Sequence, residues 1–331
     1  MKAAVLDQSD FVLKIEDVPL PELKAGQVMV KIRAASLNHH ELWPMKEKNQ
    51  FGSFKIIPGA DGAGDVVEVG PDTDISWLHK KVVINPSLNW GENVNIFGAD
   101  FEILGYPRQG TFAEYIAIEE KYLYEIPLYL SYEEAATLPL AGLTAYRALF
   151  SRGQLDRKSK ILITGISGGV ALWALLFALK MDVQVYVTSG QDDKIQKAIL
   201  AGAAGGVNYN NKDWKNELRK LEGAFDLILD GAAGNGFEVL LHLVKPGGKI
   251  VNFGRTAGHI PSFNPKLLFL KQIKLLGTTM GSDNEFKSMI YYVFYHQIHP
   301  IIDSVYPFEE IQNAFHRMEN AEHFGKIVLR M

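Results

Sequence analysis

Residues 161–194, ILITGISGGVALWALLFALKMDVQVYVTSGQDDK, decide the fold of this chain. An apolar, branched segment over Ile161–Ile163 runs into a glycine-containing turn, and an apolar stretch of helical length follows. A second branched segment covers Val183–Thr188. The order strand, glycine turn, helix, strand is typical of a dinucleotide-binding unit. Glycines let backbone N–H groups approach a pyrophosphate, and the helix N-terminus carries partial positive charge.

The glycine turn departs from the usual dinucleotide-binding spacing, G-x-G-x-x-G. Counted back from Ala171, the place of the first glycine holds Ile166, whereas small residues recur at every third position in Gly165, Gly168 and Ala171. Because the flanking strands and helix have suitable lengths, we predict that this turn binds a cofactor pyrophosphate. The predicted contacts are Gly165, Ser167, Gly168, Gly169 and Val170. The alternative is a tight strand–helix turn that holds no ligand.

The composition is that of an ordinary globular protein. The chain has 331 residues, enough for about two domains, and 47% of them are apolar and 22% charged. A net charge of −4 gives no indication of a nucleic-acid or membrane partner. The lack of cysteine excludes disulfides, thiolate zinc sites and cysteine nucleophiles. No signal-peptide pattern or membrane-length apolar run is present, so we expect a cytoplasmic enzyme with a small-molecule substrate.

The chain has two parts that differ in their sequence pattern. The first part consists of short alternating segments separated by proline and glycine, which predict a small barrel. The predicted strands there are Met1–Leu6, Leu13–Asp17, Val28–Ala34, Lys81–Asn85 and Gly110–Ile118.

From Ser131 onward, helices alternate with strands. Ser131 and Glu134 form a capping box that predicts a helix start. Predicted helices cover 133–138 and 143–152, and two more follow the N-cap candidates Asp192 and Asp213. Predicted strands cover 225–230, 249–253 and 274–278, and the tail returns to strand–helix–strand over 305–329. This order predicts an α/β protein with a doubly wound parallel sheet.

In such a sheet, ligands bind beyond the carboxyl ends of the strands. Five loops meet this edge, and all of them are rich in small or polar residues: 165–171, Ser189, 230–233, 254–255 and 277–282. From these loops we predict Ser189, Asp230, Gly254 and Gly281 as further cofactor-binding residues. The alternative for the glycines is a plain role in turns.

Motifs spread over nearly the whole chain resemble the medium-chain dehydrogenase/reductase superfamily. The resemblance is to its zinc-independent quinone oxidoreductase (zeta-crystallin-like) branch, which is related to proteins named zinc-type alcohol dehydrogenase-like. The matching segments are Ala34–Trp43 (AASLNHHELW), Pro58–Gly64 (PGADGAG), Gly110–Tyr115 (GTFAEY), Ala141–Leu149 (AGLTAYRAL), the glycine turn, and Gly325–Leu329 (GKIVL).

The resemblance implies two domains and a dimer. A GroES-like β-barrel domain is expected over residues 1–126, completed by 296–331, and a Rossmann domain over 127–295. The family also implies a homodimer, in which the strand near 274–278 extends the sheet across the two-fold axis. Lys326, in the last motif, is expected to contact the cofactor.

The chain departs from the zinc-dependent members of this family. They carry a cysteine where this chain has Asn38, a histidine where it has Ala60, and a third ligand near Leu140. The lobe that often holds a structural zinc in the family has no cysteine here. Adjacent residues of an extended segment point in opposite directions, so His39 and His40 are not expected to bind one ion together. We therefore predict no metal.

Hydride transfer without zinc suits acceptors that are already electron-poor. We therefore predict an NADPH-dependent reductase of quinones or other activated carbonyl compounds. One alternative is an enoyl-type double-bond reductase, although Phe51 and Phe54 stand where enoyl-thioester reductases often place a tyrosine. Another is a non-catalytic nucleotide-binding structural or regulatory protein. By position in the family, Asn38 donates to the substrate, Glu41 orients Asn38, and Thr144 contacts the nicotinamide.

The end of the second strand of the dinucleotide-binding unit favours NADPH over NADH. NAD enzymes place an acidic residue there to hold the ribose hydroxyls, whereas this chain has Ser189. Its hydroxyl can donate to a 2′-phosphate, and Lys194, one helical turn further on, adds positive charge. Asp192 and Asp193 count against this prediction, although Asp192 is also the expected helix N-cap.

Overall fold

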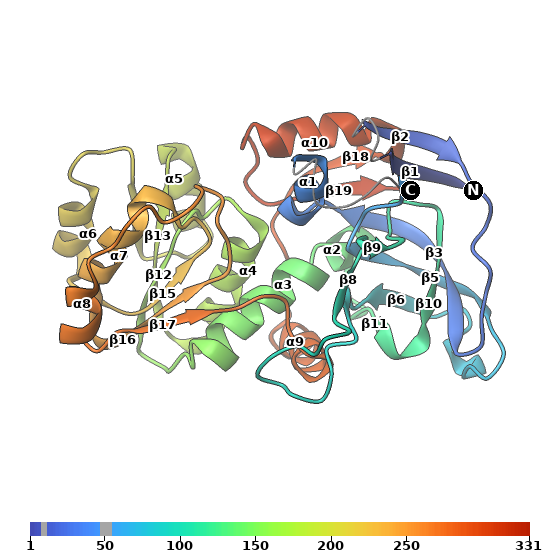
Figure 1. Cartoon of the computed structure of the whole chain (residues 1–331), viewed down its shortest axis with the longest axis horizontal. Coiled ribbons are helices and arrows are strands. Elements are labelled where there is room, and N and C mark those ends of the chain that lie inside the picture. Colours follow the sequence, from blue (N-terminus) through green and yellow to red (C-terminus); the bar gives the residue numbers. More distant parts are fainter. Residues whose placement is uncertain (8–11, 47–54) are drawn as a thin grey trace. The chain divides into compact units, whose positions relative to one another are not determined.

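The computed structural model describes residues 1–7, 12–46 and 55–331 (Figure 1). The chain forms two compact units, one of Met1–Leu143 with Gly281–Met331 and one of Thr144–Met280. We call them the GroES-like unit and the Rossmann unit. The predicted domain boundaries, after residues 126 and 295, differ from these divisions and stay a prediction.

The Rossmann unit is built on a parallel sheet of six strands in the order β14-β13-β12-β15-β16-β17. Counted along the chain, the order is 3-2-1-4-5-6, that of dinucleotide-binding folds, and it confirms the predicted fold. In Figure 1, α4 lies on one side of this sheet and α6 to α8 on the other. The strands are β12 (Lys160–Ile163), β13 (Gln184–Ser189), β14 (Gly205–Asn208), β15 (Phe225–Asp230), β16 (Val244–Asn252) and β17 (Lys274–Gly277).

The helices of the Rossmann unit begin close to the predicted places, with one exception. Asp213 stands at the N-cap of α6 as predicted, but Gln191, not Asp192, is the N-cap residue of α5. Asp192 instead accepts a hydrogen bond from Asn208 Nδ2 at 3.0 Å, because the end of β14 runs beside the start of α5. The helices are α4 (Gly169–Ala178), α5 (Asp192–Leu200), α6 (Trp214–Glu222), α7 (Phe237–Leu243) and α8 (Pro265–Leu270).

The helical segment before the first Rossmann strand begins earlier than predicted. The Ser131–Glu134 capping box is present and starts α2 (Tyr132–Ala136). The predicted helix over 143–152 is instead α3 (Pro139–Tyr146), continued by a π-helical stretch over Arg147–Arg152. Pro139 suits the first helical position because it lacks the N–H that would be unpaired there.

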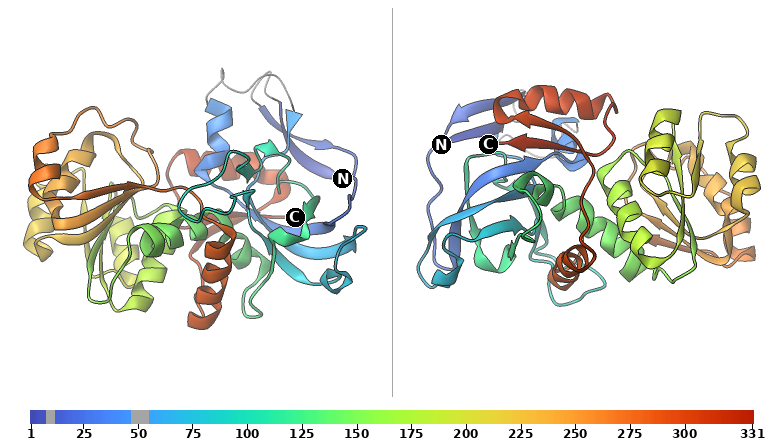
Figure 2. Two further views of the ribbon diagram at one scale, coloured as in Figure 1. Left: turned by 60° about the horizontal axis from the view of Figure 1, so that its bottom comes forward. Right: turned by 180° about the vertical axis from the view of Figure 1, so that it is seen from behind.

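The GroES-like unit has β3 (Gln27–Ser36) at the centre of its largest sheet, ordered β11-β6-β5-β3-β19-β18, with β10 also pairing β3. The last described strand of the chain, β19, runs antiparallel to β3 (Figures 1 and 2). The other strands are β5 (Asp61–Val69), β6 (Lys81–Ile84), β10 (Tyr115–Glu119), β11 (Leu123–Glu125), β18 (Ile302–Pro307) and β19 (Lys326–Arg330).

Smaller elements complete the GroES-like unit. Its two further sheets consist of β1 (Lys2–Asp7), β2 (Val12–Asp17) and β4 (Lys55–Ile56), and of β7 (Ser87–Leu88), β8 (Glu102–Leu104) and β9 (Pro107–Arg108). Its remaining α-helices are α1 (His39–Lys46), α9 (Asp283–His296) and α10 (Ile311–Glu319). One apolar core runs from β1 and β3 to α10 and β19.

Strand register brings distant polar residues together at one end of the β3 sheet. Ser36, the last residue of β3, lies opposite Asp61 in β5 and opposite Val328 in β19. Lys326 begins β19, two residues before Val328. The start of α1 follows Ser36 directly, so its first residues reach the same corner.

Candidate active site

The predicted pyrophosphate loop lies between β12 and the start of α4. Gly165 has a φ of +64°, which strains any residue with a side chain, and Gly168 is the N-cap of α4. A Cβ on Gly168 would meet only the Gly165 carbonyl oxygen, at 3.8 Å. The first N–H groups of α4 have no acceptor further back in the helix. This arrangement suits an anionic group.

Asp230 is held differently from the loop. It ends β15 and is 1% exposed. Its Oδ1 accepts from Thr164 Oγ1 at 2.8 Å and from Ala232 N at 3.2 Å, and its Oδ2 accepts from Ala233 N at 3.0 Å and Asn252 Nδ2 at 2.9 Å. The carboxylate therefore joins the ends of β12, β15 and β16, where the strand order reverses. This geometry favours a role in shaping the loops over direct contact with the cofactor.

At Gly254 and Gly281, an added side chain would lie too close to neighbouring atoms. A Cβ on Gly254 would lie 2.8 Å from the Gly231 carbonyl oxygen. A Cβ on Gly281 would lie 2.7 Å from Leu143 Cδ1. Gly281 belongs to the GroES-like unit, not to the unit that holds the pyrophosphate loop. Cofactor contact by either residue stays a prediction.

Ser189 and Lys194 are both buried in the Rossmann unit, at the end of β13 and in the first turn of α5. Ser189 Oγ accepts from Gln191 N at 3.2 Å, which leaves the hydroxyl hydrogen available to donate. Tyr209 packs against Gly190, since a Cβ there would lie 2.8 Å from the tyrosine hydroxyl. Asp192 and Asp193 are exposed.

A cluster of polar residues lies in the GroES-like unit, at the end of the β3 sheet where strand register brings them together. We call Ser36, Asn38, Asp61 and Lys326 the Asp61 cluster. Asp61 is 0% exposed. Its Oδ2 accepts from Ser36 Oγ at 2.9 Å, Asn38 Nδ2 at 2.9 Å and Lys326 Nζ at 3.0 Å, and its Oδ1 accepts from Leu140 N at 2.8 Å.

The Lys326 ammonium is fully engaged inside this cluster. It donates to the Leu37 carbonyl oxygen at 2.7 Å, to Asn38 Oδ1 at 2.5 Å and to Asp61 Oδ2 at 3.0 Å. An ammonium has three N–H donors, so these three acceptors account for all of them. Lys326 is therefore the counterion of Asp61, and the cofactor contact predicted for it stays a prediction.

Glu41 contacts the backbone next to the Asp61 cluster. Its Oε2 accepts from Asn38 N at 2.5 Å and its Oε1 from Ala60 N at 3.1 Å, so one carboxyl group holds the backbones on both sides. Burial first, and then the negative charge of Asp61, raise the pKa of Glu41 to about 7, although Lys326 and the two N–H donors act in the opposite direction. Glu41 thus contacts the Asn38 backbone, and its role in orienting the Asn38 side chain stays a prediction.

The residues of this corner do not fit a zinc ion. Asn38 presents an amide, Ala60 and Leu140 have no donor atom in their side chains, and the Lys326 ammonium lies against both Asn38 and Asp61. Zinc in proteins prefers thiolate, imidazole and carboxylate ligands. In residues 1–7, 12–46 and 55–331, no three His, Cys, Asp or Glu side chains form a group suited to a metal ion.

The predicted catalytic residues come from both units. Asn38 and Glu41 are in direct contact, whereas Thr144, in α3, begins the Rossmann unit. Phe51 and Phe54 lie outside the described residues. Sequence reasoning gave no role to Ser36 or His40. Their positions depend on strand register and on which side chain faces a cavity, which no local motif signals.

Both halves of the chain match models of dehydrogenase families. Residues 169–293 match zinc-binding dehydrogenase, and residues 24–128 match the alcohol dehydrogenase GroES-like domain. A zinc-type alcohol dehydrogenase-like protein of Leptosphaeria maculans is 33% identical, over 100% of this chain and 98% of its own length. One from Schizosaccharomyces pombe is 31% identical over 96% and 95%. A crystal structure of an NAD-dependent alcohol dehydrogenase shares 31% identity at a TM-score of 0.93, over 100% of both chains.

The chain belongs to the medium-chain dehydrogenase/reductase superfamily, among relatives of the zinc-type alcohol dehydrogenase-like kind. It is an NAD(P)-dependent oxidoreductase that acts on small molecules. More distant relatives include a bovine quinone oxidoreductase-like protein at 26% identity and a crotonyl-CoA reductase of Streptomyces avermitilis at 25%. None of the helices in the described part of the chain has the length and apolar character needed to span a bilayer.

Proposed function

We propose that this protein is an NADPH-dependent reductase that transfers hydride, without zinc, to a quinone or another activated carbonyl compound. The observation that carries the proposal is the Asp61 cluster. At the corner where zinc-dependent relatives would hold their metal, a lysine ammonium is hydrogen-bonded to Asn38 and Asp61.

The loss of zinc limits the chemistry. Zinc activates a carbonyl or an alcohol as a Lewis acid, and nothing of comparable strength replaces it in a corner where the ammonium is already saturated. The nicotinamide supplies the hydride when it is bound. Acceptors whose own structure spreads the incoming negative charge, such as quinones, need the least help from the protein. This argument favours them over simple aldehydes and alcohols.

NADPH is the favoured cofactor because the end of β13 carries no acid. A hydroxyl at Ser189 and a lysine at position 194 suit a 2′-phosphate, which an acidic residue would repel. We expect Ser189→Asp to weaken NADPH binding at least tenfold while NADH binding changes much less. Titration followed by energy transfer from tryptophan to the nicotinamide measures both. An unchanged preference between the two cofactors contradicts the assignment.

Two alternatives remain open to the same protein. An enoyl-type reductase would use the same hydride on a carbon–carbon double bond, and one distant relative is named as a crotonyl-CoA reductase. A non-catalytic nucleotide-binding protein would bind NADPH and reduce nothing. The first shares the cofactor and the cluster with our proposal, so only turnover separates them.

The deciding experiment is a panel of acceptors with purified protein and NADPH. We expect 1,4-benzoquinone to be reduced at least tenfold faster, by kcat/KM, than crotonyl-CoA or a simple aldehyde. Activity should survive exhaustive chelation, and metal analysis should find much less than one zinc per chain. Faster turnover of crotonyl-CoA favours the enoyl alternative. Stoichiometric zinc with loss of activity on chelation contradicts the proposal.

We also propose a homodimer formed along β17. Among the described strands β17 pairs only with β16, so its other edge has free backbone groups. Leu275 on this strand and Phe269 and Leu270 on the preceding helix are exposed. An unpaired, apolar strand edge is a ready site for pairing with a second copy.

A further inference from the structure

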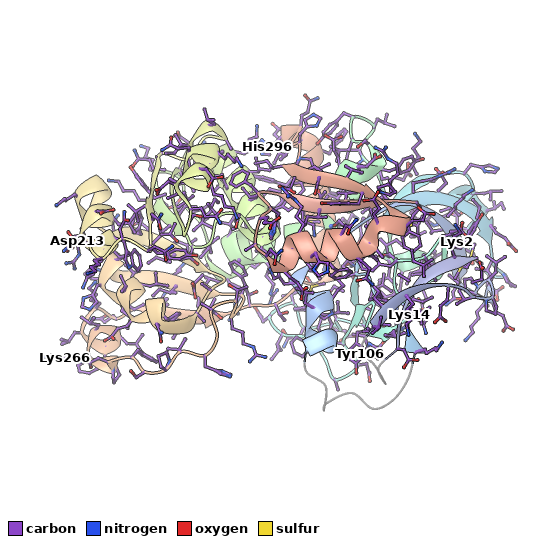
Figure 3. All side chains as sticks on the ribbon, turned by 90° about the horizontal axis from the view of Figure 1, so that it is seen from above. Lys2, Lys14, Tyr106, Asp213, Lys266 and His296 are labelled. Carbon is purple, nitrogen blue, oxygen red and sulfur yellow. The ribbon has the colours of Figure 1, made fainter. Side chains whose placement is uncertain are left out.

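A small cavity lies inside the GroES-like unit, beside the start of α1. Its volume is about 10 Å³, at the lower limit for a single water molecule or one oxygen atom. Figure 3 marks Tyr106, one of the residues that line it. The remaining lining residues are Leu6, His40, Glu41, Ile56, Pro58, Gly59 and Gly105.

One residue that lines this cavity, His40, has a ring nitrogen without a hydrogen-bond partner. Its Nε2 is buried and has no hydrogen-bond partner in the protein. Buried polar atoms in native proteins nearly always have a partner, so an exception points to a missing water or ligand. His40 also lines the cavity of one-oxygen size, which offers a place for that partner.

The neighbouring polar groups are already engaged. Both carboxyl oxygens of Glu41 accept backbone N–H groups, and the Lys326 ammonium makes all three of its bonds within the Asp61 cluster. The oxygens of Asp61 accept four donors. Neither Lys326 nor Asp61 can give or take a proton without breaking an existing contact.

Reduction of a carbonyl needs a proton as well as a hydride. The hydride brings two electrons and one hydrogen to carbon, or to the conjugated ring of a quinone, and leaves negative charge on oxygen. A general acid within hydrogen-bond distance of that oxygen completes the reaction. The Asp61 cluster, as shown above, does not supply this acid.

We propose that the cavity receives the reacting oxygen of the substrate and that His40 Nε2 is the proton donor to it. The inference rests on the reductase function proposed above. The Nε2–H bond of the imidazolium breaks, an O–H bond forms on the substrate, and the neutral imidazole regains its proton from water. One NADPH and one proton are consumed for each carbonyl or quinone reduced.

The surroundings of His40 suit an acid that gives up its proton readily. Burial lowers the pKa of His40 below its ordinary value, and the negative charge of Asp61 acts in the opposite direction. Glu41 and Lys326 are the other ionisable groups at this corner, with opposite charges when both are ionised. A lowered pKa makes the imidazolium a stronger proton donor, and the charge of Asp61 opposes part of this lowering.

The test uses the full-length protein with NADPH and 1,4-benzoquinone. We expect His40→Ala and His40→Gln to lower kcat by a factor of 10² to 10⁴ while NADPH affinity stays within twofold. Added imidazole should restore kcat of His40→Ala at least tenfold, with saturation, because the shortened side chain leaves room for it. His316→Gln, at an exposed histidine of α10, is the matched control and should behave as wild type with or without imidazole.

The outcomes separate this inference from the function on which it rests. Wild-type protein that reduces no acceptor overturns both. Active wild type with unchanged His40 variants, or with variants that imidazole does not rescue, overturns the His40 assignment alone. Should the variants fail to fold, ¹⁵N-histidine spectra of the wild type with NADP⁺ decide. We expect the His40 Nε2 signal to shift when hydroquinone is added, and an unmoved signal rejects the proposal.

Discussion

The Asp61 carboxylate lies out of contact with water, and the Lys326 ammonium is its counterion. Side chains buried this deeply with a charge are stable only when they are paired and hydrogen-bonded. Removing one partner is therefore much more damaging than replacing both. The pair also fixes Asn38, whose amide bridges the two charges.

Lys326→Met should destabilise the protein by about 3 kcal/mol, because it leaves Asp61 buried without a cation. Denaturant unfolding measures the loss. The double variant Lys326→Met with Asp61→Asn should recover part of the stability. Lys2→Met breaks an exposed pair with Glu309 at 3.4 Å and serves as the control, with an expected change below about 1 kcal/mol. Equal losses in both single variants would contradict the counterion role.

Glu41 makes stability depend on pH in a predictable direction. Its pKa is about 7 in the folded protein and 4.5 in its ordinary state, so between these values the folded chain binds more protons than the unfolded chain. Stability from this residue is complete below pH 4.5 and declines as the pH rises to 7. The full difference corresponds to about 3 kcal/mol.

Glu41→Gln should remove this part of the pH dependence. The amide also loses one of the two backbone contacts, which lowers stability equally at every pH. The free energy of unfolding, measured from pH 5 to pH 8, should therefore decline less steeply in the variant than in wild type. Parallel curves for the two proteins would show that Glu41 does not titrate in this range.

At the scale of elements, a substitution in the loop before α4 should affect cofactor binding without affecting folding. Gly168→Val should leave the fold intact, because a Cβ there meets nothing closer than 3.8 Å. The added side chain would occupy the space expected for the pyrophosphate, so NADPH affinity should drop at least a hundredfold. Gly236→Val, also in open space in the same unit, should bind normally. Normal binding by Gly168→Val would mean that the cofactor lies elsewhere.

The elements themselves were largely predictable, because each strand carries its own signal. β15 occupies the predicted residues, 225–230, and the capping box at Ser131 starts a helix as expected. The N-cap of α5 was predicted wrongly, since Asp192 is drawn to a neighbouring strand that no local pattern reveals. The Asp61 cluster joins positions 36, 38, 61 and 326 through strand register. Local sequence singled out Asn38 and Lys326 but could not pair them with Ser36 and Asp61.

At the scale of the whole molecule, the edge of β17 predicts assembly. We expect the protein to run as a dimer in size-exclusion chromatography with light scattering. Leu275→Glu should shift it toward monomer by placing a charge on the exposed edge. Leu128→Glu changes an exposed leucine of the GroES-like unit and should leave the dimer intact. A wild-type monomer at micromolar concentration would contradict the proposed interface.

The pairing of β19 with β3 also ties the candidate site to the order of synthesis. β3 and Asp61 leave the ribosome well before the lysine that balances Asp61, because the whole Rossmann unit lies between them in sequence. During translation the GroES-like unit must wait, with its central sheet incomplete and a carboxylate lacking its counterion, until β19 has been made. The Rossmann unit is continuous in sequence and needs no such delay. Any break in the chain before Lys326 would therefore remove the counterion of Asp61 from the site.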